Sequence, residues 1–334
     1  MTIGRVVTFG EAMVRLTPPA HDRLERTGLL AVTVGGAELN SAVTLRCLGV
    51  PATWVSALPT TPLGRMIERG ARAEGVDTSP VQWVPESQGR TGLYFLEEGT
   101  DPRPSAVHYD RADSAFSRLE PGTFDWSGLL DGASALHISG ITPAIGPGPK
   151  AETTTAMQAA KAAGIPVAFD LNYRSKLWSE DAARRCFAEL VPLANVLFAS
   201  RGGIRTFFGI DGDDPTMLSE VRERLGIDVV VLSRKRGKAS RSLRLGSVAM
   251  GPDGAALKGA WREVEVVDRL GGGDAFAGGF LARYVENPGD LVRALALGGA
   301  AQALKHTLPG DFLVASRAEI EAAKAAEKGG VLQR

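Results

Sequence analysis

The sequence has few cysteines, no excess of charge of one sign and no long apolar run. Two cysteines in 334 residues, Cys47 and Cys186, exclude a disulfide framework and a cysteine-based metal site. The 38 basic side chains balance the 38 acidic ones, which argues against binding of nucleic acid or anionic membranes by bulk charge. No run approaches the roughly 20 apolar residues of a membrane span, and the first residues lack a signal-peptide pattern. We therefore expect a cytoplasmic protein.

Glycine is abundant instead, with 40 residues and no collagen-like period. Such glycines are expected at turns and where the backbone approaches another group closely. Each of four glycines ends a helical pattern just before a strand-like one: Gly49, Gly75, Gly164 and Gly226. The predicted strands are 6–9, 53–57, 135–139, 165–170, 196–199 and 228–232, and the C-terminal third is predicted to be helical over 274–285, 288–304 and 317–328. This alternation is typical of an α/β domain with a mostly parallel sheet covered by helices on both faces.

Two stretches, 12–34 and 89–111, break the alternation. Both contain short strand-like pieces separated by Gly, Pro and charged turns. We interpret them as a small β-sheet that leaves the main body of a single domain spanning 1–334.

The most distinctive local sequence is DRLGGGDAFAGG at 268–279, which joins a strand-like run over 264–267 to a helix. Consecutive glycines at such a turn leave backbone N–H groups free beside a helix N-terminus, where the helix dipole favours an anion. Asp274 follows them and is suited to accept a proton from an alcohol that attacks a phosphoryl group. The alternative is a tight turn in which Asp274 only caps the helix. Neither a Walker A loop nor a dinucleotide motif after the first strand is present.

This run resembles the C-terminal signature of the PfkB/ribokinase family of carbohydrate kinases, and GGAELN at 35–40 resembles that family's N-terminal glycine pair. The resemblance implies a ribokinase-like three-layer α/β/α domain with a mostly parallel central sheet and a small β-sheet lid. It implies ATP and Mg²⁺ as cofactors, Asp274 as the catalytic base, and an anion hole for the transferred phosphoryl group at Gly271, Gly272 and Gly273. Self-association is a further expectation, since family members often form homo-oligomers.

Further segments resemble the 2-keto-3-deoxygluconate kinases of that family, among them DLNYRSKLW at 170–178 and ALKHTLPGDF at 303–312. The resemblance implies phosphorylation of 2-keto-3-deoxygluconate at its primary hydroxyl, giving the 6-phosphate. A sugar acid needs a cation, and the planar fork of arginine suits a carboxylate. The candidate substrate-binding residues are Gly35, Gly36, Asn40, Tyr94, Tyr109, Arg111, Arg174 and Asp311. The alternative is a kinase for a neutral sugar such as fructose or ribose. In that case replacing Arg111 or Arg174 would barely change substrate affinity.

The sequence departs from the family at two places. SRGG at 200–203 stands where the family has Asn-x-x-Glu, so that Gly203 replaces a carboxylate that organises magnesium. In the nucleotide loop Gly237 matches the first family glycine, but Ser240 stands at the second, within a strongly basic run. These departures allow two interpretations. In the first, the basic side chains attract the nucleotide phosphates; in the second, the ATP site has decayed and the protein is a sugar-acid binder or a weak kinase. The nucleotide-binding candidates are Ser200, Ser233, Gly237 and Gly273, and no metal ligand is assigned.

Overall fold

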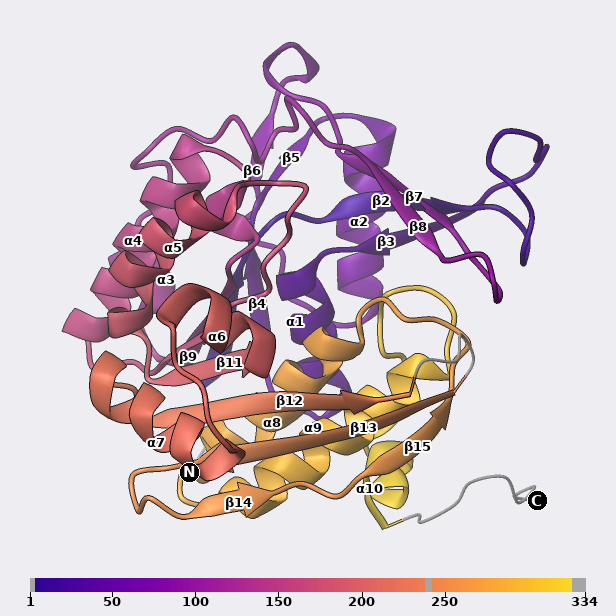
Figure 1. Cartoon of the computed structure of the whole chain (residues 1–334). Coiled ribbons are helices and arrows are strands. Elements are labelled where there is room, and N and C mark those ends of the chain that lie inside the picture. The colour runs from indigo at the N-terminus through magenta and orange to yellow at the C-terminus, as the bar shows by residue number, and fades with distance from the viewer. Residues whose placement is uncertain (1–3, 238–241, 326–334) are drawn as a thin grey trace.

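The computed structural model describes residues 4–237 and 242–325 (Figure 1). Ser240 and two basic residues of its run, Lys238 and Arg241, lie outside these ranges, as do the last residues of the helix predicted over 317–328.

The body is built on one large sheet whose strands run in the order β14-β13-β12-β11-β10-β9-β1-β4, with β15 paired to β13. The strands from β4 to β12 are parallel, and β13 pairs antiparallel with β12, β14 and β15. The predicted mostly parallel sheet is therefore confirmed. The strand bounds are β1 (Arg5–Phe9), β4 (Ala52–Val55), β9 (Ala133–Ser139), β10 (Val167–Asp170), β11 (Val196–Ser200), β12 (Val229–Arg236), β13 (Ser242–Met250), β14 (Ala256–Lys258) and β15 (Arg262–Glu265).

Helices cover both faces of this sheet, because successive strand residues point to opposite sides. Val6 belongs to one buried cluster and its neighbour Val7 to the other. The first cluster includes α1 (Ala37–Cys47), α2 (Pro62–Ala73), α8 (Gly272–Glu286), α9 (Leu291–His306) and α10 (Arg317–Ala325). The second includes α3 (Trp126–Leu130), α4 (Pro147–Ala162), α5 (Glu180–Leu190), α6 (Arg201–Phe208) and α7 (Asp214–Leu225). The result is a three-layer α/β/α body.

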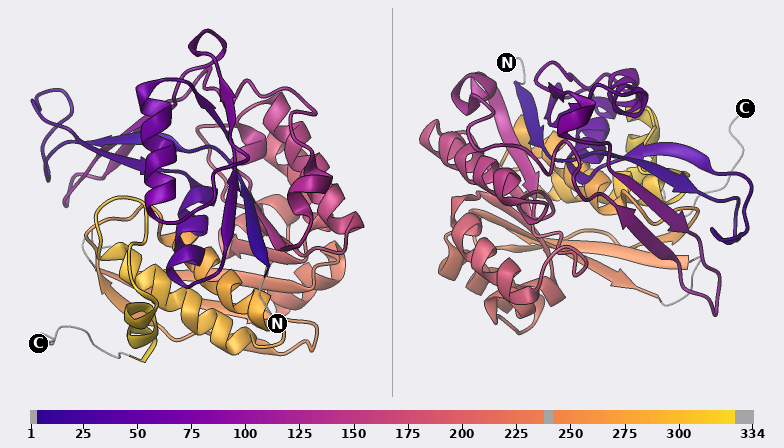
Figure 2. Two further views of the ribbon diagram at one scale, coloured as in Figure 1. Left: turned by 180° about the vertical axis from the view of Figure 1, so that it is seen from behind. Right: turned by 90° about the horizontal axis from the view of Figure 1, so that it is seen from above.

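A separate small sheet projects from one side of the body in both views of Figure 2. Its strand order is β3-β2-β7-β8, with one parallel pair, β2 with β7, and antiparallel pairing elsewhere. The strands are β2 (Met13–Thr17), β3 (Ala31–Gly35), β7 (Leu93–Glu97) and β8 (Ala106–Asp110). They lie in the two predicted stretches except for Gly35, the last residue of β3, which lies one residue beyond the first stretch. We call this sheet the lid. A short pair, β5 (Ala57–Pro59) with β6 (Gln82–Val84), lies outside both sheets.

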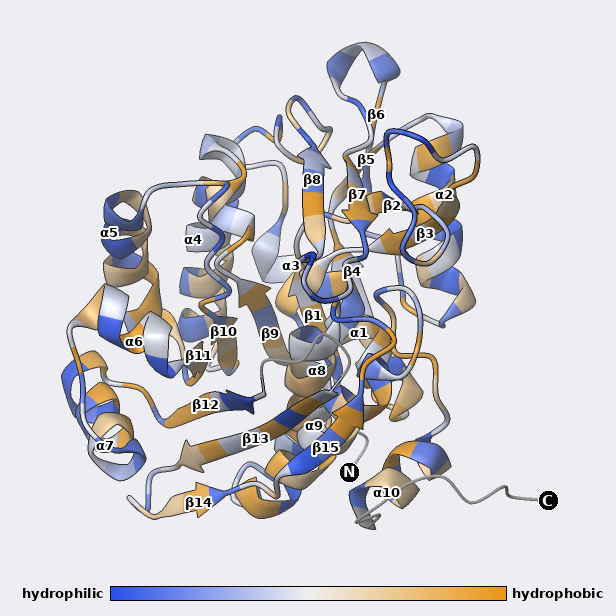
Figure 3. Cartoon of the chain, turned by 45° about the vertical axis from the view of Figure 1, so that its right-hand side comes forward, coloured by the Kyte–Doolittle hydropathy of each residue, from blue (hydrophilic) through white to orange (hydrophobic). Residues whose placement is uncertain are grey.

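Several boundaries differ from the sequence-based prediction. Helices α4 and α7 each begin one turn earlier than predicted, with a proline in their first turn, where its missing N–H costs nothing. Helix α6 was not predicted, because Gly202 and Gly203 have low helix propensity; Ile204 and Phe207 pack it into the core. Strand β12 is longer than predicted and changes from hydrophobic to hydrophilic along its length (Figure 3). None of the helices in the described ranges combines the length and apolarity that a membrane crossing requires.

Candidate active site

The glycine turn, by which we mean Gly271–Gly273, lies where the chain enters α8. Gly271 is the N-cap with φ 76°, and Gly272 and Gly273 are already helical, so the helix begins two residues earlier than predicted. A Cβ at Gly271 would lie 2.0 Å from the Asp311 carbonyl oxygen, and one at Gly272 would lie 2.1 Å from the His306 ring. A Cβ at Gly273 would meet nothing within 4 Å. The first two glycines are therefore required by close packing, whereas Gly273 leaves its backbone open to a cavity.

Asp274 stands in the first turn of α8 and is held by α1. Asn40 Nδ2 donates to Asp274 Oδ2 at 2.7 Å, and Ser41 Oγ donates to the Asp274 backbone oxygen at 3.0 Å. Burial raises the pKa of Asp274 to about 6, although the Asn40 hydrogen bond and the positive charge of Arg174 oppose the rise. A carboxylate with such a pKa is ionised near neutral pH and is a stronger base than an exposed aspartate.

A cavity between the lid and the body contains every predicted substrate-binding residue. Asp274, Gly271 and Glu11 also line it. A Cβ at Gly35 would lie 2.4 Å from the Tyr94 hydroxyl and 2.6 Å from the Asp311 carboxylate, so only glycine leaves this space open. The predicted residues brought together here are Gly35, Gly36, Asn40, Tyr94, Tyr109, Arg111, Arg174 and Asp311.

Two buried donors in this cavity lack partners. Glu11 accepts hydrogen bonds from Arg111 Nη2 and Ser114 Oγ, but Arg111 Nε and the Tyr94 hydroxyl have no hydrogen-bond partner among the described residues. Burial and the nearby charge of Asp311 raise the pKa of Tyr94 well above its ordinary value, so its hydroxyl stays protonated. Because orphaned buried donors are costly, these two atoms indicate a ligand that accepts hydrogen bonds.

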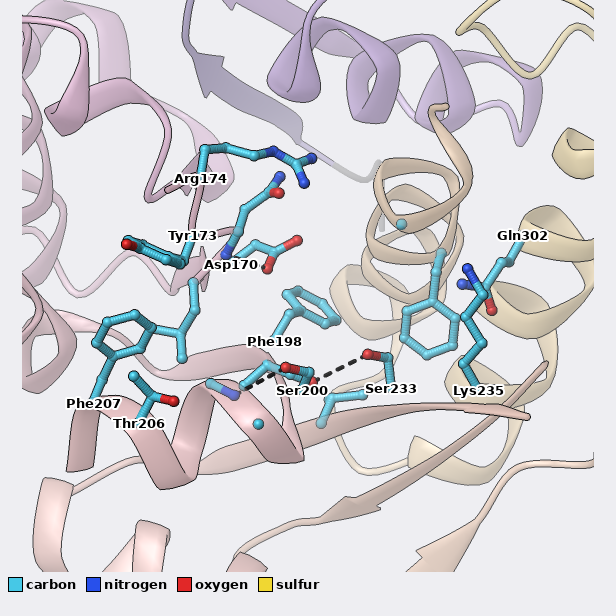
Figure 4. Close-up of a pocket in the computed structure, with 18 of the residues that line it drawn as sticks. Asp170, Tyr173, Arg174, Phe198, Ser200, Thr206, Phe207, Ser233, Lys235 and Gln302 are labelled. Atoms are coloured by element: carbon cyan, nitrogen blue, oxygen red, sulfur yellow. Dashed lines mark hydrogen bonds between the residues drawn. The ribbon is translucent and has the colours of Figure 1, made fainter. Parts of the chain in front are cut away.

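A second, larger cavity of about 570 Å³ shares Arg174 with the first and is lined by Gly273, the residue before Asp274 (Figure 4). The predicted nucleotide residues Ser200, Ser233 and Gly273 line it, together with Gly203. Ser200 is also the N-cap of α6, since its Oγ accepts from Gly203 N at 3.0 Å. Gly237 lies beyond β12, outside this lining.

Arg174 belongs to the linings of both cavities and is drawn beside Asp170 in Figure 4. No ion pair within residues 4–237 and 242–325 engages its guanidinium, in contrast to that of Arg111. An unpaired guanidinium at the junction of two cavities is suited to stabilise a negatively charged group that is transferred from one cavity to the other.

A sequence model of the pfkB family of carbohydrate kinases matches residues 4–312. The chain belongs to this family. A 2-dehydro-3-deoxygalactonokinase of Haloferax volcanii is 40% identical over 95% of both chains. A 2-dehydro-3-deoxygluconokinase of Bacillus subtilis is 29% identical over 92% of this chain and 90% of the relative. The crystal structure of a 2-dehydro-3-deoxygluconokinase from Thermotoga maritima superposes with a TM-score of 0.92 at 35% identity, covering 97% of this chain and 98% of that one. The expected ribokinase-like fold and carbohydrate kinase class are confirmed.

The sequence prediction missed a buried ionic cluster beneath the glycine turn of this kinase. Arg15 of β2 reaches from the lid to Asp268 at 2.6 Å and to Asp311 at 2.8 Å, and its side chain is 3% exposed. Burial lowers the pKa of Arg15, but the charges of Asp311 and Asp268 outweigh this effect and raise it overall. One oxygen of Asp311 is thus occupied by Arg15, while the other faces Gly35. Asp268 lies in the glycine-rich run and Lys305 in the ALKHTLPGDF segment, but no role was predicted for either, and nothing local marks Arg15.

The kinase also has carboxylates in its larger cavity, Asp170 at the end of β10 and Glu180 at the start of α5. Burial, and then the charge of Asp274, raise the pKa of Asp170 to about 7. Within the described ranges no group of three or more His, Cys, Asp or Glu side chains forms a metal site. Any ion bound here therefore takes further ligands from the substrate or water.

Proposed function

We propose that this kinase transfers the γ-phosphoryl group of ATP to the primary hydroxyl of a 2-keto-3-deoxy sugar acid, 2-keto-3-deoxygluconate or its C4 epimer. The names of its relatives, in which 2-dehydro denotes the 2-keto group, support this substrate class. The single observation that carries the proposal is the buried, unpartnered Arg111 Nε in the cavity that also contains Asp274.

The lid end of the cavity receives the carboxylate of the substrate. Arg111 Nε and Tyr94 both donate to it, and Tyr109 contributes an aromatic wall, with the Arg111 guanidinium 5.8 Å from its ring. Glu11 holds Arg111 in place and leaves Nε available. A neutral sugar could accept hydrogen bonds from the same donors through its hydroxyl oxygens, but it brings no negative charge to Arg111 and Arg174, which favours an acid over fructose or ribose.

The opposite end of the same cavity holds the reacting hydroxyl at Asp274. The Asp274 carboxylate takes the hydroxyl proton, the oxygen bonds to the γ-phosphorus, and the bond to the ADP oxygen breaks. The Gly273 N–H and the N-terminus of α8 face the negative charge of the transferred group, and Arg174 adds a positive charge between the cavities.

Mg²⁺ fits the donor chemistry of the larger cavity. The ion prefers carboxylate oxygens, commonly one or two, together with phosphates and water. Asp170 would supply such an oxygen in the absence of a carboxylate at Gly203, and a bound ion would offset the charge of the nucleotide phosphates. Lys235, which lines the same cavity, adds a positive charge on the protein side.

Replacing Arg111 by methionine is expected to raise the KM for the sugar acid about 10- to 100-fold, because one charge-assisted hydrogen bond is worth roughly 1.5–3 kcal/mol. The KM for ATP stays within a few-fold, since Arg111 lines only the sugar cavity. The matched control is Arg23→Met in the connection between β2 and β3; Arg23 pairs with Glu97 and its side chain is 51% exposed.

The measurement is ADP release over 2-keto-3-deoxygluconate, its C4 epimer, fructose and ribose. Equal turnover of the neutral sugars, with no effect of Arg111→Met, would point to the neutral-sugar alternative. Sugar-acid binding in calorimetry without any ADP release would support the decayed ATP site.

The rate is expected to depend on pH through Asp274. Only its ionised form accepts a proton, so kcat/KM should be level above neutrality and fall as pH drops through the pKa of about 6. A pH–rate profile between about pH 5 and 9 under saturating ATP measures this limb. A profile that stays level to its acid end would contradict a base with this pKa.

A further inference from the structure

We propose that Lys305 is a built-in cation of the glycine turn, a positioning residue whose ammonium group balances Asp268 and Asp311 and fixes the segment on which Gly271 rests. The inference rests on the proposed role of Gly271–Gly273 as the site that receives the transferred phosphoryl group.

The Lys305 side chain is unusual in its burial. It lies in the last turn of α9 with 0% exposure, and Nζ donates to the Leu308 backbone oxygen at 3.0 Å. Lysines are almost never fully buried unless they are paired. None of the ion pairs in the described ranges includes Lys305, although the charges of Asp268 and Asp311 act on it. Burial lowers the pKa of Lys305, and these two carboxylates oppose the change.

The two carboxylates also hold the turn itself. Asp268 Oδ1 accepts from Leu270 N, and Asp268 Oδ2 accepts from Gly310 N, both at 3.0 Å. The backbone oxygen of Asp311 packs directly against Gly271. The segment 305–311 therefore forms the floor of the glycine turn. Lys305 ties the start of this segment to Leu308 at its middle, and Asp268 holds Gly310 near its end.

The charges in this buried cluster are balanced only when Lys305 is counted. Arg15 forms ion pairs with both Asp268 and Asp311, which leaves one negative charge in excess. The Lys305 ammonium removes this excess beneath a turn that must accept a phosphoryl anion. Without it the cluster becomes net negative and the Leu308 carbonyl loses its donor. A more negative electrostatic potential at the glycine turn and a less rigid 305–311 segment both raise the energy of the transition state more than that of the bound substrates.

The test is Lys305→Ala in the full chain, assayed with whichever acceptor the wild type phosphorylates, so that the outcome does not depend on the identity of the sugar acid. We expect kcat to fall about 10- to 100-fold while both KM values stay within about threefold, less than the loss of a direct oxyanion donor. The alanine leaves a space lined by the Leu308 oxygen and facing two carboxylates. Ammonium or potassium ions should therefore restore kcat, whereas tetramethylammonium at equal ionic strength should not.

Two controls make the result specific. The wild type and Lys150→Ala, which removes an exposed lysine paired with Glu189, should not respond to ammonium. Lys305→Met, which fills more of the space, should lose kcat with weaker rescue.

A folded Lys305→Ala or Lys305→Met protein with wild-type kcat would overturn the proposal, as would a loss of kcat that ammonium and potassium leave unchanged. If neither variant folds alone, refolding that requires ammonium supports the cation role. Failure to fold in ammonium as well overturns it in favour of a packing role.

Discussion

Replacing Asp274 by asparagine is expected to lower kcat about 10²- to 10⁴-fold, the usual range for loss of a general base. The asparagine keeps the shape and can still accept the hydrogen bond from Asn40, but it cannot take the hydroxyl proton. Binding of the sugar acid should change little, because the carboxylate end of the substrate is held by Arg111 and Tyr94, away from the substitution. ADP release measures kcat, and calorimetric titration with the sugar acid measures the affinity.

The matched control is Asp125→Asn. Asp125 is the N-cap of α3, and its side chain accepts from Gly128 N. The structure excludes Asp274 as the helix cap, because Gly271 is the N-cap of α8 and no side chain in the described ranges caps it. If Asp274 had only a structural role in the first turn, the two variants would behave alike, with near-normal turnover in both. That result would remove the catalytic role that we assign to Asp274.

Replacing Arg15 by methionine is expected to destabilise the folded state by about 3–5 kcal/mol, the usual cost of removing one partner of a buried ion pair. The variant leaves Asp268 and Asp311 buried with Lys305 as their remaining cation. Urea unfolding of the wild type and the variant measures the free energy of unfolding.

The pH dependence of this loss has a defined sign. Burial raises the pKa of Asp311 while Arg15 lowers it, so removing Arg15 raises that pKa further. When the pKa of a carboxyl group is higher in the folded than in the unfolded protein, the free energy of unfolding decreases as pH rises toward the folded-state pKa. The loss caused by Arg15→Met should therefore be smaller under mildly acidic than under alkaline conditions.

The control is Arg72→Met, which removes an exposed ion pair with Glu68 on α2. Exposed pairs contribute little, so this variant should unfold close to the wild type. A similar, pH-independent loss in both arginine variants would show that the buried charges are not the cause.

Most of the scaffold was predictable from sequence because its signals are local. The glycines that end α1, α2, α4 and α7 follow directly on helical patterns, so the alternation of helix and strand could be read along the chain. The antiparallel strand β13 was missed, because its pairing with β12 is set by the whole sheet and not by a local pattern. Helix α6 was missed for the opposite reason: its glycines argue locally against a helix that packing stabilises.

The sequence by itself determined the family, the glycine turn with Asp274, and the set of residues expected around the substrate, since each lies in a short continuous motif. Only the tertiary structure decided which of those side chains are free to bind. Arg111 is occupied by Glu11 except at Nε, and Asp311 is half occupied by Arg15. The same holds for Lys305, which is far from Arg15 in the sequence yet acts on the same two carboxylates. Burial and charge pairing arise from contacts between distant segments, and no pattern within one segment records them.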